Sequence, residues 1–182
     1  MLVAGLGLLG SSAYDLHRHQ QADSQVTQQW FQLMHQVASQ RNQPQPSSPS
    51  PSTYMLYARV SFPAVSLAGV AVAGDANTLH YHDFVFWDKS VPPGGSGNSV
   101  WFFHREFGFV NINQLAAGDK IVVQTKNGKT YTYKVTQMVV VQPTTTWPLD
   151  PTKVGVITLV TCTPLWVDSE RLIIRGTLVP NA

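Results

Sequence analysis

The chain after Thr53 breaks into short runs of β-branched and aromatic residues, and this pattern most limits what it can fold into. The strongest local signal is Asn127-Gly128 within 120–141, because this dipeptide between two β-prone runs is typical of a tight hairpin. Further runs lie at 54–62, 65–74, 98–104, 155–162 and 171–179, and helical spacing is weak apart from 75–82 and 107–115. These runs predict an all-β domain of roughly six to eight strands, as a closed barrel or a sandwich.

The residues before this domain divide into a leader and a spacer. Residues 1–14 are apolar, and residues 13–40 combine good helix formers with apolar side chains at loosely helical spacing. Residues 41–52 are rich in Pro and Ser, which favours an extended, solvated segment and forbids a helix. The predicted organisation is therefore a helical leader at 1–40, a linker at 41–52 and a folded domain at 53–182.

The apolar run at the start of the chain bears on membrane attachment. It is shorter than the roughly 20 residues that a membrane-spanning helix needs. It also lacks the basic residues that normally precede the apolar part of a signal peptide. We interpret the run as the remnant of a membrane anchor, with a short buried or interfacial helix as the alternative. The domain is then expected to be attached to a membrane through its N-terminus.

Composition narrows the class of protein further. Only 12% of the residues are charged, where about a quarter is ordinary for a soluble domain. The net charge of +2, with no cluster of Lys and Arg, argues against nucleic acid as a partner. Cys162 is the sole cysteine, so no intrachain disulfide forms. Such a free thiol is unusual in an exported protein unless it has a chemical role.

Three residues of catalytic type are expected at the ends of strands. Cys162 ends one β-prone run, His104 ends another, and Arg171 opens the run that follows the cysteine. A return hairpin places the start of one strand beside the end of another, so Arg171 can lie near Cys162. A cysteine nucleophile needs a proton partner and a group that stabilises the oxyanion, and these side chains supply both. The residues alone leave the alternative open, because a lone cysteine on a β run is more often a small core residue.

The sequence TLVTC, followed by RLIIRG from Arg171, resembles the signature of sortases, the cysteine transpeptidases of Gram-positive cell surfaces. The segments ARVSFPAVSLAGVAV, PPGGSGNSVWFFHRE and INQLAAGDKIVVQTKNGKTYTYKV resemble the opening strands, the histidine segment and the following hairpin of the family. The likeness runs from about Leu56 to Val179, and its cysteine motif is nearest to that of pilin-assembling and related sortases. It implies a closed sortase-like β-barrel of about eight strands with short helices, preceded by the helical leader.

The resemblance also implies roles for individual residues. Cys162 matches the nucleophile, His104 the general acid, and Arg171 the arginine that positions substrate and stabilises the oxyanion. Thr161 matches a position that lines the substrate groove. Arg175 is the rival of Arg171, because residues four apart on a strand share a face; the spacing found in the family favours Arg171. His104 and Arg171 are also the cationic groups expected to keep the thiol ionised near neutral pH.

Several residues depart from the family pattern or compete for a role. Phe103 precedes the histidine where the family usually has a small residue, and the acidic and aromatic residues of 84–90 lie within the domain rather than in a lid before it. His82 is the alternative catalytic histidine and a candidate substrate contact. Trp147 is a candidate substrate contact too, with packing as the alternative. His80 and His82 have the spacing of metal ligands but no third ligand is evident nearby, so neither a metal nor a cofactor is expected.

The resemblance implies a cysteine transpeptidase on the extracytoplasmic face of a bacterial cell membrane. The expected partners are the sorting-signal peptide of exported proteins, of LPxTG type, and an amine from a peptidoglycan cross-bridge or a pilin lysine. The enzyme would cleave the signal and join the thioacyl intermediate to the amine. Two alternatives have the same fold: a non-catalytic module that binds peptides or scaffolds an assembly, and a hydrolytic cysteine peptidase.

Overall fold

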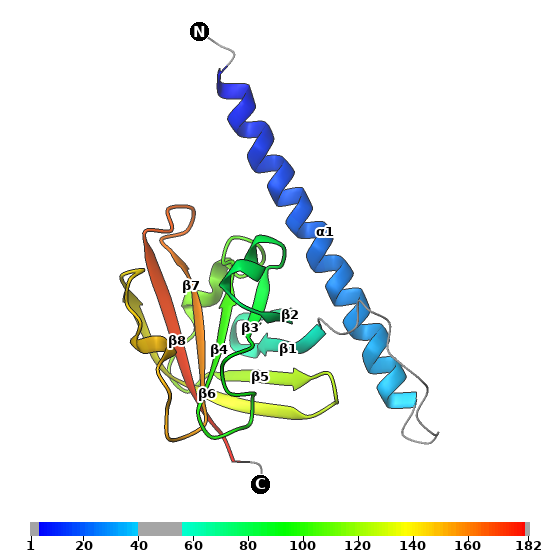
Figure 1. Cartoon of the computed structure of the whole chain (residues 1–182), viewed down its shortest axis with the longest axis vertical. Coiled ribbons are helices and arrows are strands. Elements are labelled where there is room, and N and C mark those ends of the chain that lie inside the picture. Colours follow the sequence, from blue (N-terminus) through cyan, green and yellow to red (C-terminus); the bar gives the residue numbers. More distant parts are fainter. Residues whose placement is uncertain (1–3, 40–55, 181–182) are drawn as a thin grey trace.

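The structure, a computed structural model, describes residues 4–39 and 56–180, which form a long helix and a closed β-barrel (Figure 1). The helix is α1 (Ala4–Ser39). The strands are β1 (Leu56–Phe62), β2 (Leu67–Gly74), β3 (Phe84–Trp87), β4 (Asn98–Phe103), β5 (Lys120–Thr125), β6 (Thr130–Val141), β7 (Val156–Thr163) and β8 (Glu170–Leu178). Short 3-10 helices lie in the connections: η3 (Pro63–Val65), η4 (Ala76–His80), η5 (Val110–Gln114) and η6 (Trp147–Leu149).

Within residues 56–180 the strands follow the order β1-β2-β3-β4-β7-β8-β6-β5, and β1 pairs with β5 to close the barrel. The pairs β2–β3 and β4–β7 are parallel, and the others are antiparallel. This arrangement confirms the predicted all-β barrel with short helices and a preceding helix. The turn between β5 and β6 contains Gly128, whose φ of 79° is a left-handed value that glycine adopts without steric cost.

The sequence pattern did not indicate β3. The residues of this strand are all apolar, and Phe84, Val85 and Phe86 are at most 3% exposed. A strand buried on both faces shows no alternation of polar and apolar residues. The connection from β2 spans only residues 75–83, whereas parallel strands usually need a crossover of about a dozen residues or more. The rhythm of helices and strands along the sequence therefore does not reveal β3.

An aromatic cluster fills the barrel beside β3 and β4. Phe84 packs edge-on against Trp101 and Phe109, with ring centroids 5.9 and 5.4 Å apart. Trp101 and Phe103 both belong to this core. Because successive side chains of a strand point to opposite faces, Phe102 between them points outward. The core thus determines which residues of β4 are available to a site on the outside of the barrel.

Helix α1 is continuous through the apolar run and the helix predicted at 13–40. Its C-terminal half packs on the barrel through Trp30, which is 1% exposed and lies in a cluster with Leu56 and Val70. Within residues 4–39 and 56–180, no helix combines the length and apolar character needed to cross a membrane. The predicted linker at 41–52 lies outside the described residues, and the predicted domain boundaries stay predictions.

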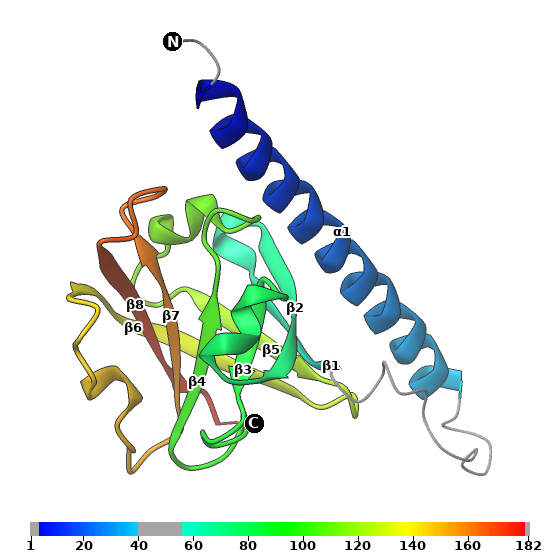
Figure 2. The ribbon, with the colours of Figure 1, turned by 45° about the horizontal axis from the view of Figure 1, so that its top comes forward.

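A second contact joins α1 to the barrel near η4. Nη2 of Arg18 donates a hydrogen bond to the carbonyl of His80 at 2.9 Å. The guanidinium carbon of Arg18 lies 5.7 Å from the ring centroid of Tyr81, within the range of a cation–π contact. The helix therefore runs beside the barrel, and its N-terminal end extends beyond it (Figures 1 and 2).

We predict that Trp30→Ala releases α1 from the barrel without unfolding the barrel. Removing a buried tryptophan costs about 3–5 kcal/mol, and the cluster around Trp30 is separate from the barrel core. Hydrogen exchange should therefore become faster across residues 20–39 while the barrel strands keep their protection. Phe31→Ala is the matched control, because this neighbouring side chain is 50% exposed. Equal protection of the helix in both variants would contradict the assignment.

Candidate active site

Three neighbouring strands, β4, β7 and β8, build the candidate site. Phe102 of β4 lies opposite Val160 of β7, which in turn lies opposite Ile173 of β8. Most of the residues that flank these three, such as Trp101, Leu159 and Ile174, belong to the barrel core. Alternation along each strand therefore places the row of Phe102, Val160 and Ile173 on the outer face of the barrel.

This row forms the floor of a pocket of about 270 Å³. Ala76 and Leu79 of η4 line one side, and residues of the β6–β7 loop line another. The loop residues in the lining are Pro143, Thr145, Pro148 and Leu149. His104, Cys162 and Arg171 also line the pocket, so the structure brings the three predicted catalytic residues to one cavity.

Strand register distinguishes the two candidate arginines. Cys162 lies directly opposite Arg171 in the antiparallel pair β7–β8, whereas Arg175 lies opposite Thr158. Nη1 of Arg171 donates hydrogen bonds to the carbonyls of Asp168 and Glu170, each at 2.9 Å. These bonds hold the guanidinium beside the β7–β8 loop while it lines the pocket. Arg171, rather than Arg175, is therefore the arginine that faces the cysteine.

His104 follows the last residue of β4 and is held at both its backbone and its ring. Its backbone N–H donates to the carbonyl of Asp83 at 2.9 Å. Its Nε2 lies 2.9 Å from the carbonyl oxygen of Leu79, and a carbonyl only accepts, so Nε2 carries a hydrogen in this arrangement. The imidazole also packs edge-on against the ring of Phe107, with centroids 5.4 Å apart. The histidine is thus oriented by η4 at the side of the pocket.

The bulky residue before the histidine is accommodated by the core. The ring of Phe103 packs against Phe84 and Phe109, with centroids 5.2 and 5.1 Å apart. Thr161 lines the pocket but is only 2% exposed, and its hydroxyl donates to the carbonyl of Phe103 at 2.7 Å. This bond ties the end of β7 to the end of β4 next to His104. Thr161 therefore contributes to the shape of the pocket near the cysteine.

The other predicted contacts lie away from the cavity lining. The Trp147 ring lies under the guanidinium of Arg175, 4.9 Å from centroid to carbon, and is not among the residues that line the pocket. His82 is half-buried, burial lowers its pKa, and it too is not among the lining residues. In the described parts of the chain, no group of three or more His, Cys, Asp and Glu side chains is arranged to hold a metal ion.

The electrostatics of the cysteine differ from the expectation that cations keep it ionised. Burial raises the pKa of the Cys162 thiol; the positive charge of Arg171 opposes this effect, and the carboxylates of Asp168 and Glu106 add to it. Burial also raises the pKa of Glu106, as does its hydrogen bond with Asp168. The resting cysteine is therefore a protonated thiol at neutral pH.

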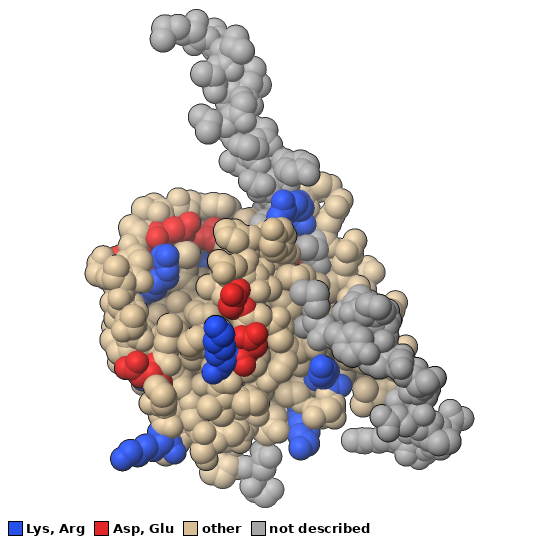
Figure 3. Space-filling model, viewed as in Figure 1, with Lys and Arg blue, Asp and Glu red and all other residues tan. Residues whose placement is uncertain are grey.

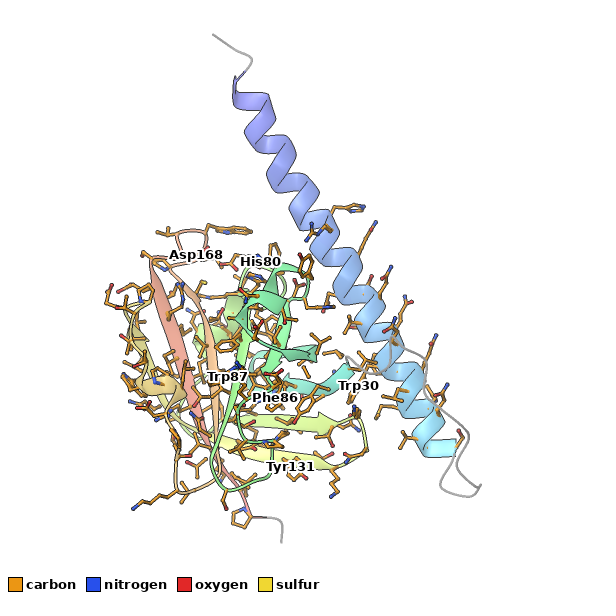
Figure 4. The ribbon with its side chains drawn as sticks, in the orientation of Figure 1. Trp30, His80, Phe86, Trp87, Tyr131 and Asp168 are labelled. Atoms are coloured by element: carbon orange, nitrogen blue, oxygen red, sulfur yellow. The ribbon has the colours of Figure 1, made fainter. Side chains whose placement is uncertain are left out.

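Two carboxylates beside the cysteine were not found from the sequence. Glu106 comes two positions after His104, and Asp168 comes three positions before Arg171, so both flank the recognised motif. Asp168 lies in the β7–β8 loop at one end of the barrel, the end that also carries His80 (Figure 4). Figure 3 shows acidic side chains beside basic ones at the upper left of the barrel face and again near its centre. A search for acids within a few residues of the motif would have found them.

Comparison with known proteins agrees with this geometry. A family model described as a sortase domain matches residues 60–179. Sortase C1 from Streptococcus agalactiae is 30% identical, with a TM-score of 0.63 over 74% of this chain and 72% of that chain. Sortase A from Corynebacterium diphtheriae, a lid mutant, is 29% identical, with a TM-score of 0.63 over 79% of this chain and 77% of that chain. A sortase D5 transpeptidase from Clostridium perfringens shares the fold, with 18% identity and a TM-score of 0.64 over 90% and 99% of the two chains. No curated protein matched the chain.

We predict that Cys162 reacts with iodoacetamide more slowly at neutral pH than a free cysteine does. The thiolate is the reactive form, so a raised pKa moves the rise in alkylation rate above the pH of about 8.5 at which free cysteine is half ionised. Glu106→Gln removes a negative charge and should shift the rise to lower pH, whereas Arg171→Gln should shift it to higher pH. Asp88→Asn, a change at an exposed acid, is the control. A midpoint at or below that of free cysteine would contradict the assignment.

Proposed function

Because the chain belongs to the sortase family, we propose that it is a cysteine transpeptidase that cleaves a C-terminal sorting signal of LPxTG type and transfers the acyl fragment to an amine. The amine comes from a peptidoglycan cross-bridge or a pilin lysine. The observation that carries the proposal is the position of Cys162 opposite Arg171, with His104 lining the same pocket. The apolar floor and sides of this pocket suit an extended peptide with apolar side chains.

In the first half of the reaction, Sγ of Cys162 attacks the carbonyl carbon of the scissile peptide bond. Because the resting thiol is protonated, its proton has to leave as the carbon–sulfur bond forms. His104 lines the same pocket and takes this proton, then gives it to the leaving amine as the carbon–nitrogen bond breaks. The products of this half are a thioacyl enzyme and a free amine, with His104 returned to its neutral form.

Arg171 stabilises the negative charge that develops on the carbonyl oxygen. Its guanidinium is fixed by the carbonyls of Asp168 and Glu170, which leaves it pre-oriented beside Cys162. A donor that is already in place stabilises the oxyanion without reorganising during the reaction. The arginine thus contributes mainly to the transition state of the reaction.

In the second half, the incoming amine attacks the thioester carbon and His104 accepts a proton from the amine. The proton then returns to sulfur as the carbon–sulfur bond breaks, which restores the thiol and releases the new amide. Water at the same carbon would give a carboxylic acid and hydrolysis instead. The apolar side chains of the pocket, such as Leu79 and Leu149, favour the transfer because they limit access of water.

We further propose that the protein is attached through its N-terminus to the extracytoplasmic face of a bacterial cell membrane. The apolar sequence of residues 1–14 and the extension of α1 beyond the barrel support this location (Figures 1 and 2). Fractionation of cells that express the full chain tests it: recovery in the membrane fraction is expected. Recovery only in the medium or the cytosol would contradict it.

We predict that the protein joins an LPxTG-type peptide to triglycine, as measured by intact mass of the products. Cys162→Ala should abolish both the ligated product and the thioacyl adduct without a change in thermal unfolding. Release of carboxylic acid despite excess triglycine would favour a hydrolytic peptidase. Peptide binding that survives alkylation of Cys162, with no turnover of several sorting-signal peptides, would favour the non-catalytic module.

We also predict that Arg171→Ala lowers kcat at least about 100-fold, because a lost oxyanion donor usually costs this much. Arg175→Ala should lower kcat far less, since Arg175 lies opposite Thr158 rather than the cysteine. Steady-state kinetics with one peptide and saturating triglycine give both values. The reverse ranking would show that the other arginine stabilises the oxyanion.

A further inference from the structure

The three strands that carry the reactive residues also carry a second polar group on the same face. Asn98 begins β4, six positions before His104, while Thr158 of β7 and Arg175 of β8 each lie four positions from the reactive residue of their strand. Even separations keep side chains on one face of a strand. The outer face therefore has a reactive end, the apolar floor of the pocket, and a polar end made by Asn98, Thr158 and Arg175.

The polar end is one directed chain of hydrogen bonds. Nε of Arg175 donates to Oγ1 of Thr158 at 3.2 Å, and the Thr158 hydroxyl donates to Oδ1 of Asn98 at 2.7 Å. The amide nitrogen of Asn98 donates to the carbonyls of Pro148 and Asp150, at 2.8 and 2.9 Å. Since both carbonyls only accept, they fix which way the Asn98 amide points. Thr158 is fully buried and Asn98 is 4% exposed, so water cannot reach their polar groups. The hydrogen bonds of this chain satisfy those groups instead.

This chain of bonds ends on the β6–β7 loop, where η6 forms one side of the pocket. The two carbonyls that Asn98 binds flank Leu149, and Pro148 and Leu149 both line the cavity. η6 has no side-chain hydrogen bond at its N-cap, so its own sequence supplies no cap. Arg175 makes a second contact with the same loop, because its guanidinium lies on the ring of Trp147, 4.9 Å from the centroid.

We propose that Arg175, acting through Thr158 and Asn98 and through the ring of Trp147, is a positioning residue that fixes the β6–β7 loop as one side of the peptide pocket and so sets peptide affinity. This inference rests on the proposed function, since it assigns the pocket to the peptide substrate. Four residues of strand separate Arg175 from Arg171, about 13 Å along β8. Arg175 is thus too far along the strand to share the oxyanion with Arg171, and its effect is expected on binding rather than on chemistry.

The test compares Arg175→Gln and Arg175→Lys with Lys153→Gln in the full chain. Lys153 is exposed and lies in the same loop, so its change removes the same charge without touching the hydrogen-bond chain. Hydrogen exchange is followed at the amides of Leu149 and Asp150, which donate within η6 to Thr146 and Trp147. Peptide Kd is measured with each change placed in the inactive Cys162→Ala background, and KM and kcat are measured with Cys162 present.

Arg175→Gln is expected to speed exchange at these two amides and to raise Kd and KM about tenfold, the scale of one lost hydrogen bond from a charged group. The kcat and the rate of Cys162 alkylation should stay within about twofold of the unmodified protein, because the reactive end is untouched. Arg175→Lys should recover part of the loss, since an ammonium can lie over Trp147 and donate to Thr158. If Arg175→Gln does not fold, the exchange and Kd measurements on Arg175→Lys still test the inference.

Unchanged exchange and unchanged Kd in both Arg175 variants would overturn the inference. A fall in kcat with Kd retained would overturn it too, because Arg175 would then act on the reaction itself. An equal effect of Lys153→Gln would show that the loss of a positive charge, rather than of these hydrogen bonds, causes the change. That result would also overturn the inference. If the unmodified protein ligates no peptide, the proposed function fails by itself, and exchange at Leu149 and Asp150 still decides whether Arg175 holds the loop.

Discussion

The antiparallel pairing of β7 with β8 sets the geometry on which the rest of the site depends. This pairing puts Cys162 opposite Arg171 and, four residues along, Thr158 opposite Arg175. Because side chains alternate between the two faces of a strand, a slip of one residue would turn the cysteine toward the core and separate it from its arginine. Fully buried side chains on the inner face, such as Leu159, oppose such a slip, since it would expose them. Packing inside the barrel thus maintains the chemistry outside it.

The surroundings of the cysteine limit how reactive it is at rest. Burial and the carboxylates of Glu106 and Asp168 raise the pKa of the thiol more than Arg171 lowers it. A protonated thiol reacts slowly with oxidants and with electrophiles other than the substrate, because the thiolate is the nucleophile. In the proposed reaction the thiol loses its proton only when a peptide carbonyl is in place, because His104 accepts the proton as the carbon–sulfur bond forms. Such an arrangement suits a single free cysteine in a protein expected to work outside the cytoplasm.

Much of the fold followed from local sequence, and the limits of the prediction have physical causes. The hairpin at Asn127-Gly128 and the runs that became β4, β7 and β8 were visible because turn dipeptides and runs of β-branched and aromatic residues are local signals. β3 was hidden because it is buried on both faces and reached by a short parallel connection. The choice between Arg171 and Arg175 depends on register, since residues four apart share a face and alternation cannot separate them. The hydrogen-bond chain through Asn98 was also invisible, because it joins three strands to a distant loop.

Two hydrogen bonds described separately above meet on one short element. In η4, the carbonyl of Leu79 accepts from the ring of His104, and the next carbonyl, that of His80, accepts from Arg18 of α1. The two carbonyls belong to one 3-10 turn, and hydrogen bonds from the backbone N–H groups of Tyr81 and His82 to the carbonyl of Thr78 limit rotation of the peptide planes between them. The tilt of the long helix and the orientation of the imidazole are therefore linked mechanically. A force on the N-terminal end of α1 would be transmitted through Arg18 and η4 to the imidazole of His104.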